Sequence, residues 1–205
     1  MQALVLASGS QYRAGLLARL GVEFQTISPD INESAHASEF PAELAKRLAS
    51  EKAHAVMNEL LSRSNSDSHA ETHGQTIIIA SDQVASYGDT LLGKPMTNRK
   101  ACQQLASMSG RTIRFYTSLH LLDLKSLDRY VAQDVTCATL RELDAETIAR
   151  YVERDQPLDC AGSFKVESLG ISLFKSVSSD DPTALVGLPM IELCHGLRQF
   201  GVQIP

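Results

Sequence analysis

The sequence predicts a mixed α/β domain, and three observations support this fold class. The β-branched run 76–80 is typical of a central strand, and several other segments have apolar residues at helical spacing. Two long β-rich stretches, 112–124 and 129–140, are separated by a short turn and indicate an antiparallel ribbon. A chain of 205 residues suits a single domain over 1–205, with room for two lobes. The sheet is therefore expected to be mixed.

Hydrophobic periodicity and the residues typical of helix ends place the individual elements. The expected strands, besides the ribbon, lie at 2–7, 22–27, 76–80 and 171–174. The expected helices lie at 12–20, 41–61, 98–108, 145–154 and 189–200. Thr97 and Asp144 suit helix N-caps, and Gly21 and Gly110 suit C-caps. The polar segment 62–75 is expected to form an exposed loop.

Composition argues against several classes of protein. The net charge of −5 disfavours binding to a nucleic-acid backbone, which normally requires a basic face. No apolar run approaches the roughly 20 residues of a membrane span, and the N-terminus lacks the basic region of a signal peptide. His69 and His73 have metal-binding spacing but no third ligand nearby. Without any Cys-x-x-Cys pair, we expect free, mostly buried thiols in a reducing cytoplasm at Cys102, Cys137, Cys160 and Cys194.

The segment Ser8-Gly9-Ser10-Gln11-Tyr12-Arg13 follows the first expected strand and opens the first expected helix. A helix N-terminus carries free N–H groups and the positive end of the dipole, and both favour a phosphate. Ser8 and Ser10 add hydroxyl donors, and Arg13 can bind phosphate through two parallel hydrogen bonds. A capped helix with a surface arginine explains the same residues, so the loop alone does not decide between the two.

Acidic residues follow two of the expected strands. Asp82, in Ser81-Asp82-Gln83, comes directly after the buried run 76–80, at the sheet edge where ligands gather in α/β folds. There it can bind a divalent metal or accept a proton from water, although capping a turn is the commoner role of an isolated Asp. Glu33, in Asp30-Ile31-Asn32-Glu33, is either a second oxygen ligand for a metal or part of a solvated turn.

Two lysines and one stretch of small residues complete the candidates. Lys52 lies on the long helix among Ala and Val, and Lys94 lies in the turn Gly93-Lys94-Pro95. Each either neutralises phosphates or is an ordinary surface charge. The stretch 159–167 contains glycine and permits close approach of a ligand, and Glu167 within it is either a specificity residue or a solvent-facing acid.

These motifs occur in an order and spacing that resembles the Maf family of nucleoside triphosphate pyrophosphatases. The matching segments span nearly the whole chain and are Ser8–Arg13, Ser28–Glu33, Glu51–Ala53, Ala80–Val84, Leu92–Pro95, Ser109-Gly110, Asp159–Phe164 and Asp181–Pro189. The resemblance implies an elongated central sheet flanked by helices, as in inosine triphosphatases, with a cleft between two lobes. It also implies hydrolysis of a nucleoside triphosphate to the monophosphate and pyrophosphate. Segment 62–75 looks like an insertion.

On the basis of this resemblance, roles can be assigned to the candidate residues. Asp82 is expected to accept a proton from the attacking water or to orient it, and Asp82 and Glu33 are expected to bind a divalent cation, Mg²⁺ or Mn²⁺; the sequence does not divide these roles of Asp82 between base and metal ligand. The residues expected to hold the triphosphate are Ser8, Ser10, Arg13, Lys52 and Lys94. A homodimer is compatible with the resemblance, and the expected partner is a nucleotide, with no nucleic acid or membrane.

Within the family, Ser81-Asp82-Gln83 and the stretch 162–167 resemble the subgroup that acts on 7-methyl-GTP. This implies that Tyr12, Gln83 and Glu167 select the base. 7-Methylguanine carries a positive charge, which an aromatic ring and a carboxylate both favour. Two alternatives stay open: a pyrophosphatase of the same fold that prefers dTTP or UTP, and a nucleotide-binding sensor or division-control protein that does not require turnover.

Overall fold

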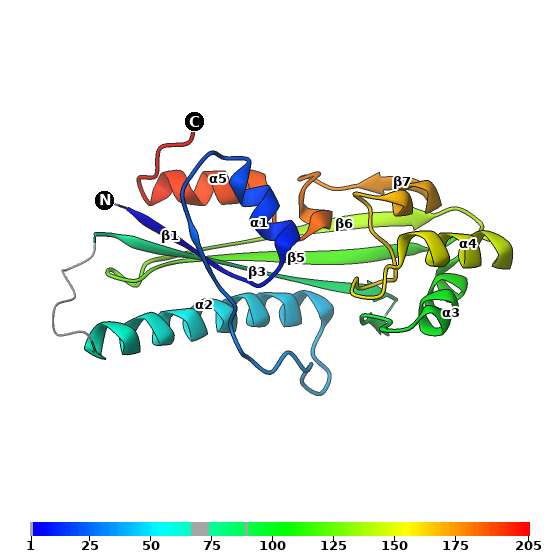
Figure 1. Cartoon of the computed structure of the whole chain (residues 1–205), viewed down its shortest axis with the longest axis horizontal. Coiled ribbons are helices and arrows are strands. Elements are labelled where there is room, and N and C mark those ends of the chain that lie inside the picture. The colour runs from blue at the N-terminus through cyan, green and yellow to red at the C-terminus, as the bar shows by residue number, and fades with distance from the viewer. Residues whose placement is uncertain (1, 67–73, 89) are drawn as a thin grey trace.

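The computed structural model describes residues 2–66, 74–88 and 90–205 and shows a mixed α/β fold (Figure 1). A seven-stranded sheet has the order β2-β1-β3-β5-β6-β7, with β4 paired to β3 beside this path. The strands are β1 (Ala3–Ala7), β2 (Gln25–Ile27), β3 (Thr76–Tyr87), β4 (Thr90–Leu92), β5 (Thr112–Asp123), β6 (Arg129–Leu140) and β7 (Phe174–Ser178). The helices are α1 (Gln11–Ala18), α2 (Pro41–Ser66), α3 (Asn98–Met108), α4 (Ala145–Asp155) and α5 (Met190–Gln199), with the short 3₁₀ helices η1 (Leu169–Leu173) and η2 (Ala184–Val186).

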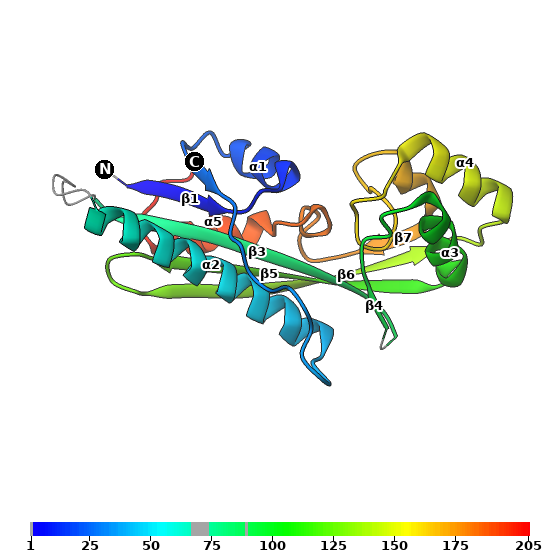
Figure 2. The same cartoon turned by 60° about the horizontal axis from the view of Figure 1, so that its bottom comes forward.

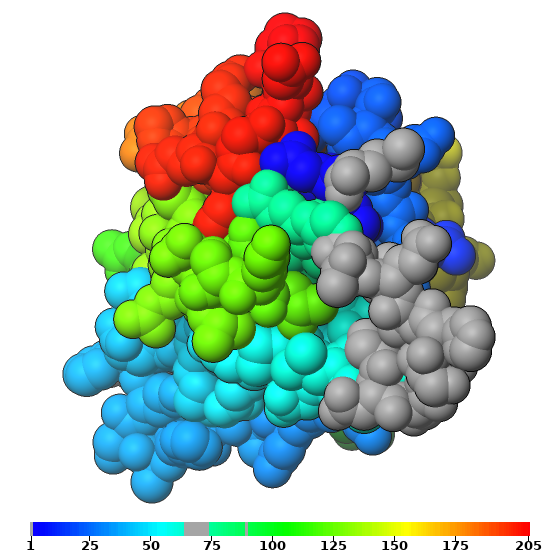
Figure 3. Space-filling view, turned by 90° about the vertical axis from the view of Figure 1, so that its left-hand side faces the viewer, coloured from blue at the N-terminus to red at the C-terminus, as the bar shows by residue number. Residues whose placement is uncertain are grey.

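The sheet combines both strand orientations, which confirms the predicted mixed sheet. β1 lies parallel to β2 and β3, and the remaining pairs are antiparallel. The predicted ribbon is β5 and β6, paired from Thr112↔Thr139 to Leu122↔Arg129. In Figure 3 the turn that joins them (lime green) lies between α5 (red) and α2 (cyan) at one end of the molecule.

Helices cover both faces of the sheet and one of its ends. α2 packs on one face, while α1 and α5 pack on the other (Figures 1 and 2). α3 and α4 lie together at the opposite end of the long strands, as Figure 2 shows. Separate apolar clusters fill these spaces: one joins β1, α1 and α5, and another joins α3, α4 and the ends of β5 and β6. The long strands β3, β5 and β6 therefore connect two lobes.

The predicted end of the third strand is wrong. We expected a strand over 76–80, but β3 continues to Tyr87, so Asp82 lies within the strand and not after it. The reason is a distant partner: β5 pairs with β3 from Ile77↔Asp123 to Ser86↔Arg114. This ladder satisfies the backbone across the polar triplet Ser81-Asp82-Gln83, which on its own is typical of a turn.

Three other elements differ from the sequence prediction. The strand expected over 22–27 is shortened to β2. The first five residues of the expected loop 62–75 belong to α2, whereas 67–73, including His69 and His73, lie outside the described residues. The strand expected over 171–174 is also displaced, because residues 169–173 form η1 and β7 starts only at Phe174.

The four cysteines are free, as expected, but half-buried. Within the described chain, no helix is long and apolar enough to cross a membrane.

Candidate active site

An interrupted sheet edge lies at the centre of the candidate site. β1 pairs with β3 only as far as Leu6↔Ile79, and β4 pairs with β3 from Ala85 onward. Within the described residues, 80–84 of β3 therefore have no strand partner on this edge. Side chains alternate along a strand, so Asp82 points toward α2 while its neighbour Gln83 points toward η2. Side chains from both faces of β3 can thus reach the same opening.

Asp82 forms a buried ion pair with Lys52 of α2. The Lys52 Nζ lies 2.5 Å from Asp82 Oδ1 and 2.6 Å from Glu33 Oε1, so one ammonium group joins two carboxylates. The side chains of Lys52 and Asp82 are 9% and 8% exposed, whereas that of Glu33 is 58% exposed. Burial raises the pKa of Glu33, but its hydrogen bond with Lys52 and the charges of Lys52, Lys94 and Arg13 together bring that pKa below its ordinary value.

The loop after β1 forms the predicted N-terminus of α1. Ser10 is the N-cap and accepts a hydrogen bond from the Arg13 backbone N–H, while Ser8 Oγ accepts one from the Ser10 N–H. Both functions proposed for this loop are therefore compatible, because a capped helix N-terminus is also an anion site. Gly9 leaves room for Ser28, whose Oγ would lie 3.0 Å from a Cβ at this position.

The Arg13 guanidinium is partly committed to protein contacts. Its Nε donates to the Gly187 carbonyl at 2.8 Å, and its Nη1 lies 3.3 Å from Ser8 Oγ. Ser81 Oγ donates to the same Gly187 carbonyl at 2.9 Å. Burial lowers the pKa of Arg13, and the negative charges of Asp82 and Glu33 partly offset this effect. A phosphate can approach Arg13 through its terminal nitrogens, since Nε is already used.

These side chains border one cavity of about 640 Å³. All residues predicted to bind phosphate or metal contribute to its wall, together with Tyr12 and Gln83 from the predicted base-selecting set. Ser28, Pro29 and Asp159 also border this cavity. The structure therefore brings together residues from β1, α1, the loop before α2, α2, β3 and the loop before α3, which are far apart in the sequence.

A second cavity of about 200 Å³ adjoins the first. It shares Tyr12, Gln83 and Lys94 with the larger cavity and adds Glu167, the remaining predicted specificity residue. Its other walls are largely apolar and include Phe115, Phe164, Val166 and Leu185. A charged cavity thus continues into a smaller, partly aromatic one, as expected for a ligand with a phosphate end and a ring end.

Two carboxylates act on the Tyr12 hydroxyl. Burial raises the pKa of this hydroxyl, and the nearby Cys160 thiol and the carboxylates of Asp159 and Glu167 raise it further, while the positive charge of Lys165 lowers it. Tyr12 is 39% exposed and borders both cavities, so a ligand in either cavity can contact it. This arrangement favours a flat, positively charged group beside Tyr12.

Sequence comparison agrees with these observations. Residues 3–200 match the Maf family, described as Maf-like protein. The chain belongs to the Maf family. It is 46% identical to the 7-methyl-GTP pyrophosphatases of Xanthomonas axonopodis pv. citri and of Pseudomonas putida, each over 205 residues and 100% of both chains. A solved structure of a nucleoside-triphosphatase / dITP/XTP pyrophosphatase from Mycobacterium abscessus aligns at 13% identity and a TM-score of 0.37, over 70% of this chain and 76% of that one.

Two features of this Maf protein were not anticipated from its sequence. Gln104 of α3 accepts a hydrogen bond from Ser163 Oγ and donates one to the Gly93 carbonyl at 3.3 Å, which links the Lys94 turn to the loop before Glu167. Ser163 is buried and has a φ of 62°, a conformation that favours glycine. No local pattern marks Gln104, because its two partners come from segments on either side of it in the chain.

The hydrogen bonds of the Gln83 side chain limit which of its atoms can contact a base. Its Nε2 donates to Thr117 Oγ1 and to the carbonyls of Ala184 and Leu185, at 2.9 to 3.1 Å. The amide nitrogen is therefore occupied by protein acceptors, and the amide oxygen is the atom that remains for a ligand. A guanine edge presents donors, so an accepting oxygen is chemically suitable.

The acidic pair also fits a divalent cation that is shared with a substrate. Among the described residues, no group of three or more Asp, Glu, His or Cys side chains could hold a metal ion without other ligands. Mg²⁺, however, is commonly held by one or two carboxylates together with substrate phosphates and water. Asp82 and Glu33 meet that requirement, because Lys52 contacts one oxygen of each and leaves the other.

Proposed function

We propose that this Maf protein hydrolyses 7-methyl-GTP to 7-methyl-GMP and pyrophosphate. Its relatives with that activity in their names align over the full length of both chains. The observation that carries the proposal is the junction of the two cavities, where Tyr12 and Glu167 line the smaller cavity and Lys52 and Asp82 line the larger. The first pair suits a cationic base, and the second suits phosphate chemistry.

The smaller cavity provides two interactions that depend on the charge of the base. A cation over a desolvated aromatic ring gains about 2 kcal/mol. A carboxylate such as Glu167 accepts hydrogen bonds from the guanine edge and offsets the positive charge. A neutral pyrimidine gains neither interaction and leaves the carboxylate without a partner, which is unfavourable in a partly desolvated site.

The larger cavity holds the triphosphate and the attacking water. Ser8, Ser10 and the N-terminus of α1 donate hydrogen bonds, while Arg13, Lys52 and Lys94 neutralise the phosphate oxygens. Asp82 accepts a proton from water while the water oxygen attacks the α-phosphorus. The bond between the α- and β-phosphoryl groups breaks, and pyrophosphate takes the electron pair of that bond. Lys52 Nζ, 2.5 Å from Asp82 Oδ1, keeps this carboxylate oriented before the attack.

A divalent cation belongs to this proposal. Glu33 and Asp82 would hold Mg²⁺ or Mn²⁺ with the phosphates, and the cation would supply neutralisation of the charge that develops on the leaving group. Lys52 lies close to both carboxylates because its ammonium group compensates two neighbouring negative charges.

The location and assembly of the protein are also proposals. Free, half-buried cysteines suit a reducing cytoplasm. The net charge of −5 suits a small nucleotide as the partner and not a nucleic-acid backbone. A homodimer follows only from the resemblance to the family, and sedimentation equilibrium of the purified chain would distinguish it from a monomer.

A panel of nucleotides tests the proposed activity. Pyrophosphate release would be measured with 7-methyl-GTP, GTP, dTTP and UTP, with Mg²⁺ or Mn²⁺ present. The expected result is the highest kcat/KM for 7-methyl-GTP. A preference for UTP or dTTP would reject the base assignment while keeping the reaction, and no release from any nucleotide would favour a binding protein without turnover.

A further inference from the structure

The loop that carries Glu33 has no regular structure of its own. Residues 28–40 connect β2 to α2 without a helix or strand. Glu33 itself is largely exposed, yet its carboxylate must stay beside Lys52 and Asp82 for the proposed reaction. Exposed loops are normally the mobile parts of a protein. The contacts that fix this loop therefore determine where the Glu33 carboxylate lies.

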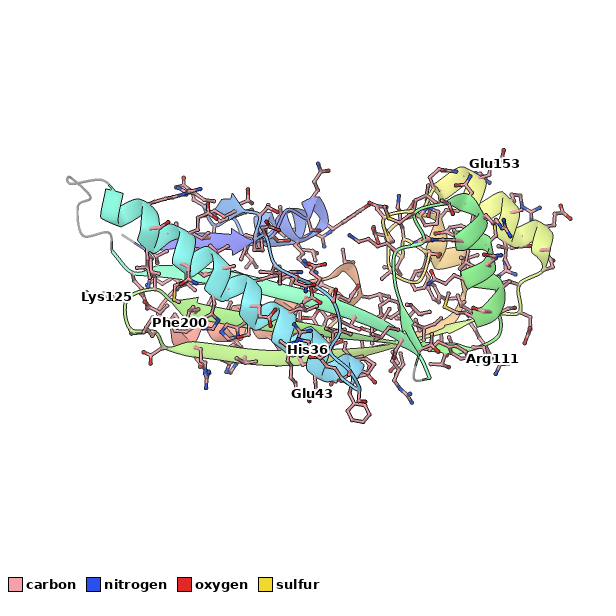
Figure 4. All side chains as sticks on the ribbon, turned by 90° about the horizontal axis from the view of Figure 1, so that it is seen from below. His36, Glu43, Arg111, Lys125, Glu153 and Phe200 are labelled. Atoms are coloured by element: carbon pink, nitrogen blue, oxygen red, sulfur yellow. The ribbon has the colours of Figure 1, made fainter. Side chains whose placement is uncertain are left out.

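Arg47, in the second turn of α2, donates three hydrogen bonds to this loop. Its Nη2 donates to the backbone carbonyl of Ser34 at 2.9 Å, directly beside Glu33. Its Nε and Nη2 also bind the two oxygens of Glu39 at 2.7 and 2.9 Å, in a bidentate pair. Glu39 in turn accepts the backbone N–H of His36 at 2.9 Å. Figure 4 shows His36 at the N-terminal end of α2.

A second acidic residue, Glu51 of α2, also binds the Arg47 guanidinium. The Arg47 Nη1 donates to both oxygens of Glu51, one turn later on α2, at 3.0 and 3.1 Å. Glu51 is the residue before Lys52, which binds the Glu33 carboxylate. α2 therefore contacts the loop at two neighbouring residues: Arg47 binds the Ser34 backbone, and Lys52 binds the Glu33 side chain.

This ion pair differs from the exposed pairs on the same protein. The side chains of Arg47 and Glu39 are 19% and 11% exposed, compared with 54% and 86% for Arg150 and Glu146 on α4. Exposed pairs hold their partners weakly because water and ions screen them. A partly buried, bidentate arginine fixes both the distance and the orientation of its partner.

We propose that Arg47, with Glu39, is a positioning residue that holds the Glu33 carboxylate beside Lys52 and Asp82. The inference rests on the proposed function, because Glu33 matters only if the acidic pair serves the reaction. Arg47 does not border either cavity, so it acts through the loop and not on the substrate. Its effect on turnover should therefore disappear when Glu33 can no longer contribute.

A double-mutant cycle between Arg47→Lys and Glu33→Gln tests this dependence. Lysine keeps the positive charge, but its single ammonium group cannot donate hydrogen bonds to Ser34, Glu39 and Glu51 together. We expect Arg47→Lys to lower kcat by about 10- to 100-fold, the scale reported for small misplacements of catalytic groups. In the Glu33→Gln background the same change should have less than a twofold effect. Equal effects in both backgrounds, or no loss in the single variant, would overturn the proposal.

Two further measurements separate positioning from stability. Arg150→Lys, in an exposed pair on α4, is the matched control and should leave kcat unchanged. Hydrogen exchange of the backbone amides 34–39 should accelerate in Arg47→Lys and in Glu39→Gln, while exchange in the second half of α2 stays as in the parent. A lowered melting temperature with unchanged kcat and unchanged loop exchange would assign Arg47 a purely structural role.

The proposed hydrolysis and the positioning role of Arg47 can be rejected independently. If the parent protein releases no pyrophosphate from any nucleotide, the proposed function fails, and the exchange of amides 34–39 still decides whether Arg47 fixes the loop. If the parent is active but the cycle is additive, the activity stands and the positioning role is rejected.

Discussion

Asp82 and Lys52 face each other across the layer between sheet and helix, with Lys52 Nζ 2.5 Å from Asp82 Oδ1 and both side chains buried. The carboxylate comes from β3 at the interrupted sheet edge, and the ammonium comes from the middle of α2. This pair connects the stability of the fold with the proposed chemistry, because the Asp82 carboxylate is costly to bury without a positive charge, whereas Lys52 also pairs with Glu33.

Replacing Asp82 should abolish turnover with little change in fold. Asp82→Asn keeps the shape of the side chain and removes the proton acceptor, and loss of a general base costs about 10²- to 10⁴-fold in kcat. Pyrophosphate release from 7-methyl-GTP measures this effect, and circular dichroism checks the fold. Asp128→Asn, in the exposed turn between β5 and β6, is the control. Near-normal turnover in Asp82→Asn would remove Asp82 from the mechanism.

Replacing Lys52 should primarily destabilise the protein. Lys52→Met retains the apolar stem but leaves the buried Asp82 without its cation, close to the negative charge of Glu33. Breaking a buried pair in this way costs about 3–5 kcal/mol. Urea unfolding would measure the loss, and adding Asp82→Asn to Lys52→Met should recover much of it. A double variant no more stable than Lys52→Met would show that the charge of Asp82 is not the cause.

Removal of divalent cations should stop the reaction. A chelator is expected to abolish pyrophosphate release, and Mg²⁺ or Mn²⁺ should restore it. Glu33→Gln weakens one of the two proposed ligands, so the cation concentration for half-maximal rate should rise at least about tenfold, the scale found around metal sites. Glu43→Gln, an exposed acid on the first turn of α2, provides the comparison. Full activity with the chelator present would reject the metal.

The base-selecting role of Glu167 predicts a change in preference and not only in rate. Glu167→Gln keeps the side-chain size but removes the negative charge that pairs with the cationic base. The ratio of kcat/KM for 7-methyl-GTP to that for GTP should fall about tenfold or more, because only the cationic base loses a charge–charge attraction, worth more than about 1 kcal/mol in a partly desolvated site. Glu153→Gln, an exposed residue in the last turn of α4 (Figure 4), serves as the control. An unchanged ratio would exclude Glu167 from base selection.

Local signals in the sequence were sufficient for helix ends and for the chemistry of the candidates. Ser10, Thr97 and Asp144 each accept a backbone N–H from the third residue after them, as their positions before helical segments predict. The phosphate loop and the acidic segment around Glu33 were also visible, because their meaning depends on a few adjacent residues and on their resemblance to a family.

Tertiary contacts determined what the sequence could not predict. The length of β3 depends on its ladder with β5, whose paired residues are 28 to 46 positions apart in the chain, and not on the polar residues around Asp82. The partner of Asp82 lies on a helix, and the role of Lys52 could equally have been that of a surface charge. Arg47 and Gln104 join segments that no local pattern connects. Such residues become apparent only when the fold brings their partners together.

The pair formed by His120 and His54 predicts a pH dependence of stability. Their rings are in edge-to-face contact at 5.8 Å, and His120 Nε2 is buried without a hydrogen-bond partner among the described residues. Burial, aided by the charges of His54 and Arg129, lowers the pKa of His120 from 6.5 to about 4. The folded protein therefore keeps this ring neutral at a pH where the unfolded chain binds a proton.

The sign of the effect follows from that difference in proton binding. Stability from neutral His120 is complete above pH 6.5, the ordinary pKa, and is lost as the pH falls toward 4. The maximal loss is about 3 kcal/mol, from 1.36 kcal/mol for each pKa unit. The free energy of unfolding, measured by urea titration at pH 7 and pH 5, should fall in the parent and change much less in His120→Leu. An equal decrease in both proteins would mean that other groups cause it, because leucine has no proton to bind.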